Sequence, residues 1–283
     1  MDRRKALYEG RAKAIYQGLE PGTLIQYFKD DIATLGNQDS AVMAGKGVLN
    51  NRISAHIMAK LENVGVPTHF IRSLNMREQL VKKVEMIPLE IIVRNATQGE
   101  ICERLGAKEG QVLSQPLVEF YYKNNAGQKS LVSEQHIMGL QWADPYELEE
   151  MVFQTLRIND FLSGLFTAIG IRLIDFKIEF GRLFGEHEEL YIILADDISP
   201  DNCCLWDDRS GEKLDKNRFP KEAGNIVEGY QEIAKRLGLI PESGIIEGGN
   251  INEAAAEDLA EIKNVAGKRH LRSVKKTPMK PRV

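Results

Sequence analysis

Short runs of apolar residues, separated by polar residues and glycines, dominate the first ninety positions and predict β-strands. Two such runs surround Gly10 in ALYEGRAKAIYQ, and TLIQYFKD follows as a third. Later runs are THFIRSL and EMIPLEIIVRN. Pro88 lies inside the last run, and because proline cannot donate to a strand ladder it favours an edge or an irregular position there.

One helix is predicted among these strands. It starts after Gly47 and stops at Gly65, just before Pro67. Its apolar face is marked by four residues at four-residue spacing, namely Leu49, Ile53, Ile57 and Leu61.

Past residue 95 the pattern changes to longer helices. Asp144 is a typical N-cap residue, Pro145 suits the first helical position, and Glu147 completes a capping box, so a helix is expected from there to about Ile169. Strands IRLIDFKIEF and ELYIILAD follow, and another helix is predicted from about Pro220 to Leu237.

This order of elements predicts an α+β protein. We expect a β-rich lobe over residues 1–90, a mixed α/β lobe over 91–240 and a C-terminal extension over 241–283.

Charged residues interrupt the strand IRLIDFKIEF on one face only. Strict alternation places Ile171 and Leu173 on the same face as three charged residues, Asp175, Lys177 and Glu179, and makes the other face almost wholly apolar. Successive residues on that face are spaced by about 7 Å, which suits contacts with a ligand or metal along the strand.

The next strand adds a second carboxylate. A hairpin centred near His187 and Glu188 would set Glu179 opposite Asp196, and opposed residues share a face. Two opposed carboxylates repel unless a cation lies between them, and Mg²⁺ prefers such oxygen ligands together with substrate phosphates. A charged, solvent-facing hairpin in which Lys177 bridges the acids explains the same spacing, and the pattern alone leaves both open.

The turn YEGRAK is a candidate phosphate site. One glycine stands between two strand-like runs, with Arg11 and Lys13 just after it, so backbone N–H groups and side-chain charge could hold a polyphosphate. Most such turns are plain hairpins, and this one is neither a Walker loop nor a dinucleotide fingerprint. The five histidines form no metal-binding spacing.

Composition indicates a soluble globular protein. Of the 283 residues, 43% are hydrophobic and 28% charged, no apolar run has the length of a membrane span, and the charged N-terminus is no signal peptide. We therefore expect a cytoplasmic protein without membrane partners. Cys102, Cys203 and Cys204 are then expected to be free thiols rather than a disulfide framework.

The C-terminus carries a separate charge pattern. Residues 263–283 hold eight Lys or Arg and no acid, which leaves 29 cations against 41 acids elsewhere, a net charge of −12. We expect a loosely docked or disordered tail. It has no aromatic residues, so binding of nucleic acid is not expected.

Eight ordered motifs make the chain similar to SAICAR synthetases. They are LYEGRAKAIY, FKDD, GKGVLNNRIS, PLEIIVRN, EFYYKN, IRLIDFKIEFGR, LADDISPDNCCLWD and KLDKNRF. The resemblance runs from about Leu7 to Leu239. It implies a two-lobed α+β fold, whose N-terminal lobe is similar to that of protein kinases and whose C-terminal lobe is similar to ATP-grasp enzymes.

The same resemblance implies an ATP-dependent carboxylate–amine ligase of purine biosynthesis. ATP would phosphorylate the carboxylate of a phosphoribosyl aminoimidazole carboxylate, and the amine of L-aspartate would displace phosphate to form an amide. A homo-oligomer that uses ATP and Mg²⁺ is expected.

Site residues follow from matching motifs. By resemblance, the ATP phosphates are expected at Gly10, Arg11 and Lys13, with Met86 beside the adenine and Lys123 near the nucleotide. Mg²⁺ is expected on Glu179 and Asp196. Asp175 and Lys177 would face the reacting carboxylate or the aspartate, and the phosphoribosyl substrate would be held by Arg94, Asp201 and Lys216.

Three positions depart from the family pattern. Cys204 stands where an arginine grips the substrate phosphate, Glu100 stands where a serine contacts it, and Pro220 replaces another arginine. Loss of one charge-assisted contact costs about 1.5–3 kcal/mol, and a carboxylate near the phosphate adds repulsion. Alternatives therefore stay open beside the standard reaction: a paralogue that ligates another carboxylate, or a nucleotide-binding protein without ligase activity.

Overall fold

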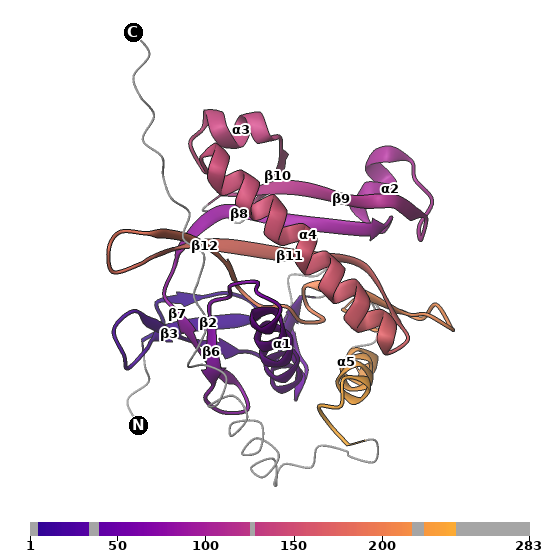
Figure 1. The fold of residues 1–283 in the computed structure, drawn as a ribbon. Coiled ribbons are helices and arrows are strands. Elements are labelled where there is room, and N and C mark those ends of the chain that lie inside the picture. Colours follow the sequence, from indigo (N-terminus) through magenta and orange to yellow (C-terminus); the bar gives the residue numbers. More distant parts are fainter. Residues whose placement is uncertain (1–4, 34–39, 125–127, 217–223, 242–283) are drawn as a thin grey trace.

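Two antiparallel sheets organise the chain in this computed structural model, as Figure 1 shows. The structure describes residues 5–33, 40–124, 128–216 and 224–241. The α+β class is confirmed. The smaller sheet is built from residues before 83 and the larger sheet from residues after 84, whereas the boundary expected at residue 90 falls inside a strand and stays a prediction.

The smaller sheet has the strand order β1-β2-β3-β7-β6. Strands β1, β2, β3 and β6 and the adjoining helix confirm predicted N-terminal elements, whereas β7 is not predicted. The bounds are β1 Tyr8–Glu9, β2 Lys13–Gln17, β3 Thr23–Phe28, β6 Phe70–Ser73, β7 Glu78–Lys82 and α1 Lys46–Asn63. A separate two-stranded sheet is formed by β4, Asp31–Ala33, and β5, Ser40–Val42.

The larger sheet has the order β10-β9-β8-β11-β12, and β13 also pairs with β11. Every pairing in it is antiparallel. The bounds are β8 Glu85–Ala96, β9 Val112–Lys123, β10 Lys129–Val132, β11 Ile171–Phe184, β12 Leu190–Ala195 and β13 Cys203–Asp207. This sheet therefore brings the charged strand β11 beside β8, the strand with the motif PLEIIVRN.

Pro88 is predicted at an edge strand or at an irregular position, and the structure shows the irregular position. The edge position is wrong, because β8 lies between β9 and β11. The pairing of β8 with β11 shifts register between Glu179 and Gly181, at the level of Pro88. The shift accommodates a residue that has no N–H to donate.

The long helix α4, Pro145–Ala168, confirms its local start signals. The Asp144 side chain accepts from the Glu147 N–H at 2.9 Å, and the Glu147 side chain accepts from the Asp144 N–H at 2.8 Å. Figure 1 shows α4 crossing the larger sheet, where it contacts β11 and β12. Such a cap stabilises a helix by about 1 kcal/mol.

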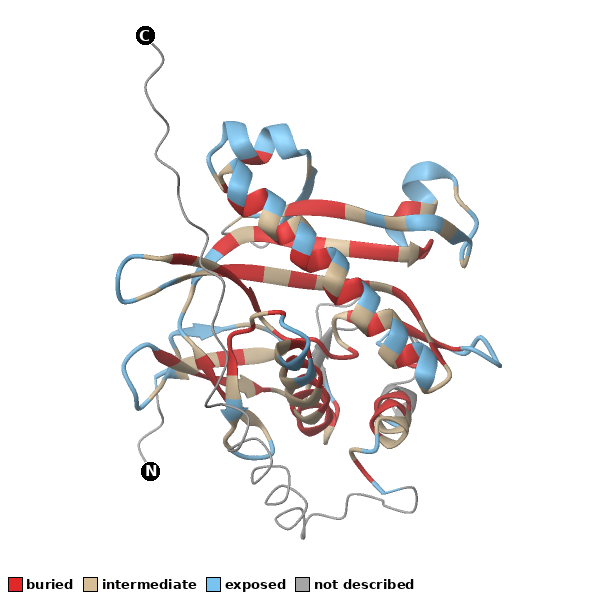
Figure 2. Cartoon of the chain, viewed as in Figure 1, coloured by how far each residue is buried: buried red, intermediate tan, exposed pale blue. Residues whose placement is uncertain are grey.

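One core cluster joins the two parts of the molecule. Buried residues of α1, α4, β8 and β11 belong to it, including Ile53, Ile158, Ile91 and Phe176. Figure 2 shows the buried segments concentrated where α4 and α1 meet the strands. Burial of this apolar surface is the main stabilising contribution to the fold.

The remaining helices are α2, Glu100–Leu105, α3, Glu134–Gly139, and α5, Gly224–Arg236, which packs beside α1. The start predicted for the last helix, Pro220, and the basic tail 263–283 lie outside the described residues. None of the helices in the described ranges has the length and apolar character that a bilayer crossing requires.

Candidate active site

One face of the larger sheet gathers the predicted chemistry. In the register of β11 with β8, Asp175 lies opposite Arg94, and Glu179 lies opposite Glu90. Opposed and next-but-one residues point to the same side, so this face continues across β9 and β10. We call it the polar face. Its charged residues are Asp175, Lys177, Glu179, Glu90, Arg94, Glu119, Lys123 and Lys129.

Strict alternation fails at one position of β11. A β-bulge between Leu173 and Asp175 leaves Ile174 without a partner on β13. Ile171 and Leu173 therefore lie in the main core with Phe176, and not on the side of Asp175 as predicted. Because side chains alternate between the two faces with a period of two, one extra residue makes the side chains before the bulge point to the opposite face from the one that alternation predicts.

The predicted hairpin register is wrong by one residue. Glu179 lies opposite Ala195, not Asp196. The connection is a three-residue loop, in which Gly185 donates to Glu189 at 2.8 Å and Glu188 adopts the left-handed conformation at φ 62°. Such a loop adds one residue to a two-residue turn, and the register follows from it.

Asp196 nevertheless comes close to Glu179. It follows β12 with φ 62°, which takes its side chain out of the strand alternation. Burial and the charge of Asp196 raise the pKa of Glu179. Burial alone would raise the pKa of Asp196, but Lys13 and Lys177 outweigh it and lower that pKa to about 2. The two carboxylates are therefore close enough to repel.

These carboxylates fit the requirements of Mg²⁺. The ion uses one or two protein carboxylates and completes its shell with phosphates and water. Across the described ranges no group of three or more potential ligands from His, Cys, Asp and Glu is found, so a site made only of such side chains is absent there. A cation between Glu179 and Asp196 would relieve their repulsion.

The turn after β1 places its lysine at the same carboxylates. Gly10 donates to the Lys13 carbonyl at 2.8 Å and closes the turn, and Arg11 is exposed beside it. The Lys13 ammonium contacts both Asp196 and Asp197. Although burial lowers its pKa, the two carboxylates outweigh this effect and raise it, so Lys13 is a fixed positive charge at this end of the polar face.

Met86 and Lys123 flank the same end. Met86 is 43% exposed on β8, opposite Gly181. Lys123, the last residue of β9, is exposed, and its charge acts on Glu179. Their predicted roles at the nucleotide stay predictions.

Arginines occupy the opposite end of the polar face. The buried Arg94 donates to Glu119 at 2.7 Å and to Asp175 at 3.4 Å. Arg104 contacts the other oxygen of Glu119 and lies 3.7 Å from Glu100. One buried carboxylate, Glu119, thus holds both guanidinium groups, and Arg94 also reaches Asp175.

Cys204 touches the predicted catalytic carboxylate. It lies opposite Asp175, and their side chains are hydrogen-bonded. Burial, followed by the charge of Asp175, raises the pKa of the Cys204 thiol, so it stays protonated and donates to that carboxylate. Glu100 is exposed at the start of α2. Glu100 and Cys204 stand at opposite ends of a chain of contacts through Arg104, Glu119, Arg94 and Asp175. The third departure from the family pattern, Pro220, lies outside the described residues.

Asp201 and Lys216 lie in the loops around β13. The Asp201 carboxylate contacts Lys46 and accepts from Asn50 at 2.8 Å and from Tyr230 at 2.6 Å. Lys216 donates to the Asp201 carbonyl at 2.8 Å. Asp201 therefore joins α1 to α5, and its predicted contact with the substrate stays a prediction.

Sequence reasoning missed several members of this network. Glu90 and Glu119 carried a usable signal, because they lie four residues before Arg94 and Lys123 on the same faces of their strands. Lys46 and Asp197 carried none, because their partners are set by loops. All three cysteines are free, as predicted.

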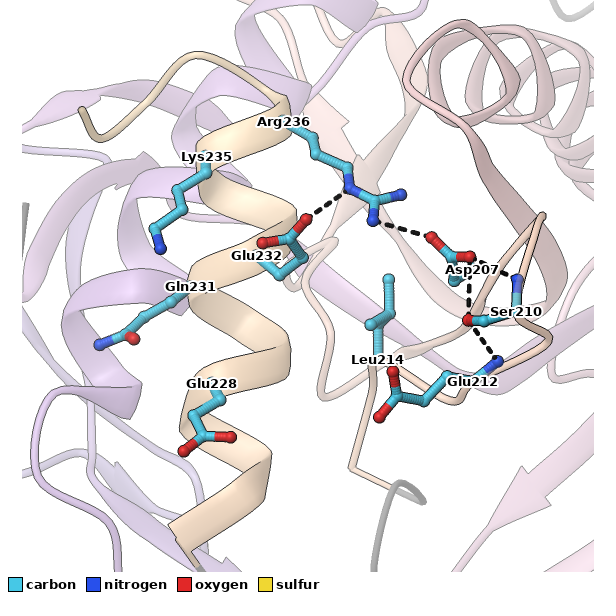
Figure 3. Close-up of a pocket in the computed structure, with 9 residues that line it drawn as sticks. All are labelled: Asp207, Ser210, Glu212, Leu214, Glu228, Gln231, Glu232, Lys235 and Arg236. Atoms are coloured by element: carbon cyan, nitrogen blue, oxygen red, sulfur yellow. Dashed lines mark hydrogen bonds and ion pairs between the residues drawn. The ribbon is translucent and has the colours of Figure 1, made fainter. Parts of the chain in front are cut away.

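A pocket lies elsewhere in the described structure, apart from the predicted site residues. It encloses about 400 Å³ between α5 and the turn after β13. Figure 3 shows Arg236 extending from α5 toward Asp207, which it contacts at 2.8 Å, while it also bonds Glu232 at 2.8 Å. None of the predicted site residues lines this pocket.

Comparisons with known proteins agree with this geometry. The family model described as SAICAR synthetase matches residues 6–237. A phosphoribosylaminoimidazole-succinocarboxamide synthase of Rhodospirillum centenum is 56% identical over 244 residues, which cover 86% of this chain and 96% of that protein. The same-named protein of Gluconobacter oxydans is 57% identical over 245 residues, with the same two coverages.

Solved structures are similar as well. The phosphoribosylaminoimidazole-succinocarboxamide synthase of Ehrlichia chaffeensis aligns with a TM-score of 0.79 and 45% identity over 84% of this chain and 100% of its own. A SAICAR synthetase in complex with ADP aligns with a TM-score of 0.76 and 36% identity, over 83% of this chain and 99% of its own. The chain belongs to the SAICAR synthetase family.

Proposed function

We propose that this protein is a phosphoribosylaminoimidazole-succinocarboxamide synthase. It joins the carboxylate of phosphoribosyl aminoimidazole carboxylate to the amine of L-aspartate and converts ATP to ADP and phosphate. The observation that carries the proposal is the polar face, which combines lysines and carboxylates at one end with two arginines at the other, in a chain 56% identical to a relative of that name.

The reaction has two chemical steps. A carboxylate oxygen of the ribotide attacks the γ-phosphorus of ATP, and ADP leaves. The aspartate amine then attacks the acyl carbon, phosphate leaves with the bonding electrons, and the amine loses a proton. The acyl phosphate is needed because a carboxylate itself has no adequate leaving group.

Phosphoryl transfer depends mainly on positioning and charge stabilisation. Lys13 and the turn at Gly10 are suited to hold the phosphates. Glu179 and Asp196 would hold Mg²⁺, which neutralises charge on the transferring phosphoryl group when it is bound. A relative solved with ADP supports the use of ATP.

Asp175 and Lys177 are suited to different roles. Burial lowers the pKa of Lys177, but Asp196 and Glu90 outweigh it and raise the pKa, so this lysine stabilises negative charge as an ammonium. Burial raises the pKa of Asp175 despite Cys204 and Arg94. Asp175 is therefore the better candidate to accept the proton of the attacking amine.

Arg94 is suited to hold the ribotide. It is 5% exposed and fixed by Glu119, so its guanidinium keeps one orientation toward Asp175. The planar fork of arginine matches carboxylate and phosphate oxygens. Lys216, Asp201 and the positions of Glu100 and Cys204 complete the proposed substrate end.

Location and assembly belong to the same proposal. We infer a cytoplasmic homo-oligomer without membrane or nucleic-acid partners, which sedimentation of the purified protein and fractionation of cells would test.

Growth of a purine-auxotrophic mutant that lacks this synthase tests the function. We expect expression of the chain to restore growth, and the purified protein to form the amide from ATP, the ribotide and L-aspartate. Absence of both growth and product, with soluble folded protein present, would contradict the proposal.

A further inference from the structure

Glu90 is a buried carboxylate to which the proposed mechanism gives no role of its own. It is 1% exposed in the middle of the polar face, opposite Glu179 on β11 and Tyr121 on β9. Two ammonium groups lie against it: Lys129 at 2.5 Å from one oxygen and Lys177 at 3.2 Å from the other. A buried charge needs such partners, so Glu90 and the two lysines form one unit.

Lys129 reaches this unit from the edge of the sheet. It starts β10, pairs with Lys123 on β9, and extends past β9 to the carboxylate on β8. Burial alone would raise the pKa of Glu90, yet Lys177 and Lys129 outweigh it and lower that pKa. The carboxylate is therefore ionised at neutral pH and holds one ammonium on each side.

Both ammonium groups keep donors for a ligand. An ammonium has three N–H donors. Lys129 donates one of them to Glu90, and Lys177 forms an ion pair with the same carboxylate. The Lys129 and Lys177 side chains are 42% and 25% exposed, whereas the Glu90 side chain is 1% exposed. The carboxylate is buried, whereas part of each lysine side chain is accessible to a ligand.

The local charge favours an anion. Lys123 is close enough for its charge to act on both Lys129 and Glu179. Two lysines contact Glu90, and a third, Lys123, lies beside Lys129, while Glu179 is expected to be engaged by a metal ion. The proposed cationic partner of the ATP phosphates is Lys13, at the other side of Glu179. The proposed cationic partner of the ribotide is Arg94. L-Aspartate, with two carboxylates, is the substrate that still lacks cationic partners.

We propose that Lys129 and Lys177, held in place by Glu90, bind a carboxylate of the amine substrate. Lys129 is the binding residue that the sequence motifs do not assign, and Glu90 is the positioning residue. The inference rests on the proposed function, because it takes L-aspartate as the amine. It makes an amine with a second carboxylate the preferred one.

The first test replaces Lys129 by methionine, which is neutral, unbranched and only one heavy atom shorter. We expect Lys129→Met to raise KM for L-aspartate about tenfold and to leave kcat and KM for ATP within about twofold. Lys129→Arg should retain KM for aspartate within about threefold. Lys213→Met is the matched control, since Lys213 pairs with Glu109 at 2.8 Å on the surface, away from the polar face.

A binding measurement makes the test independent of turnover. Succinate carries the two carboxylates of aspartate without the amine. In calorimetric titrations with Mg²⁺ and ADP present, succinate should bind the wild type about tenfold more tightly than Lys129→Met, and ADP should bind both alike. Weaker ADP binding in Lys129→Met would instead assign the ammonium to a nucleotide phosphate and overturn the inference.

Glu90→Gln tests the positioning role. It should raise KM for aspartate and also lower kcat, because Lys177 loses its partner, whereas KM for ATP should stay within about twofold. If thermal melting shows that this buried change unfolds the protein, the result for Lys129 decides. Equal effects of Lys129→Met and Lys213→Met, or none, would overturn the inference while wild-type ligase activity still supports the proposed function. If the wild type is inactive as a ligase but binds succinate through Lys129, the proposed function is overturned and the inference about the carboxylate-binding lysines is not.

Discussion

The two ends of the polar face carry different kinds of positive charge. At one end, Lys13 contacts Asp196 and Asp197 close to Glu179. At the other end, Arg94 and Arg104 share Glu119. Ammonium groups are compact charges that suit phosphates and reacting centres, whereas the rigid guanidinium fork suits recognition of a fixed shape. The proposed phosphoryl-transfer end and the proposed recognition end are thus built from different residues.

The difference also separates retained residues from changed ones. Lys13, Glu179 and Asp196 match the family pattern, whereas Glu100 and Cys204 depart from it, and both belong to the arginine end. Cys204 does not leave a gap there, since its thiol bonds Asp175. The departures from the family pattern among the described residues are thus confined to the proposed recognition end. Three experiments probe the two ends.

The largest effect is expected at the lysine end. Glu179→Ala should lower kcat/KM at least about 10³-fold, about 4 kcal/mol of transition-state stabilisation, because it removes one of two proposed metal carboxylates. Product formation and ADP binding are measured across Mg²⁺ concentrations. Glu186→Ala, an exposed glutamate of the same hairpin, is the control and should be active. If Glu179→Ala retains magnesium-dependent ADP binding and turnover at the wild-type level, the assignment of phosphoryl transfer to this end is wrong.

An intermediate effect is expected for Asp201. Its carboxylate holds the buried Lys46, so Asp201→Asn should lower the free energy of unfolding at pH 7 by about 3 kcal/mol. Burial raises the pKa of Asp201, but Lys46 outweighs it and lowers that pKa below its ordinary value of 3.8. The carboxylate therefore stabilises the fold above pH 3.8, and the deficit of the variant should shrink as the pH falls below that value.

Denaturation at several pH values checks this prediction, with the exposed Asp208→Asn as control. A deficit that is constant with pH would show that the charge of Asp201 is not its cause. The KM of folded Asp201→Asn for the ribotide is then measured, to find whether Asp201 also contacts this substrate. A rise would assign Asp201 to the recognition end as well as to the contact between α1 and α5.

The smallest effect is expected at the arginine end. The double change Glu100→Ser, Cys204→Arg should lower KM for the ribotide about tenfold, about 1.4 kcal/mol, because it swings the local charge by two units. It also relieves Arg104 of its contact with Glu100. Affinity for ATP should stay within about threefold. Glu103→Ser on the same helix is the control, and an unchanged or higher KM in the folded double variant would mean that other groups hold the ribotide.

Local signals in the sequence determined the elements and the family. Asp144, Pro145 and Glu147 predict the start of α4, because a capping box involves only neighbouring residues. The charged residues of β11 are visible as a period of two from Asp175 to Glu179. The motifs around these residues are sufficient to identify the family.

Only the tertiary structure decided which residues meet. The loop ending at Glu188 shifts the hairpin by one residue, and the bulge at Ile174 reverses the sides of β11 before it. The contacts of Glu90 with Lys129 and of Lys13 with Asp196 join residues far apart in the chain. Periodicity reports the side of a strand on which a residue lies, but the partner across the sheet depends on turns, bulges and strand order, which become fixed only when the sheet has assembled.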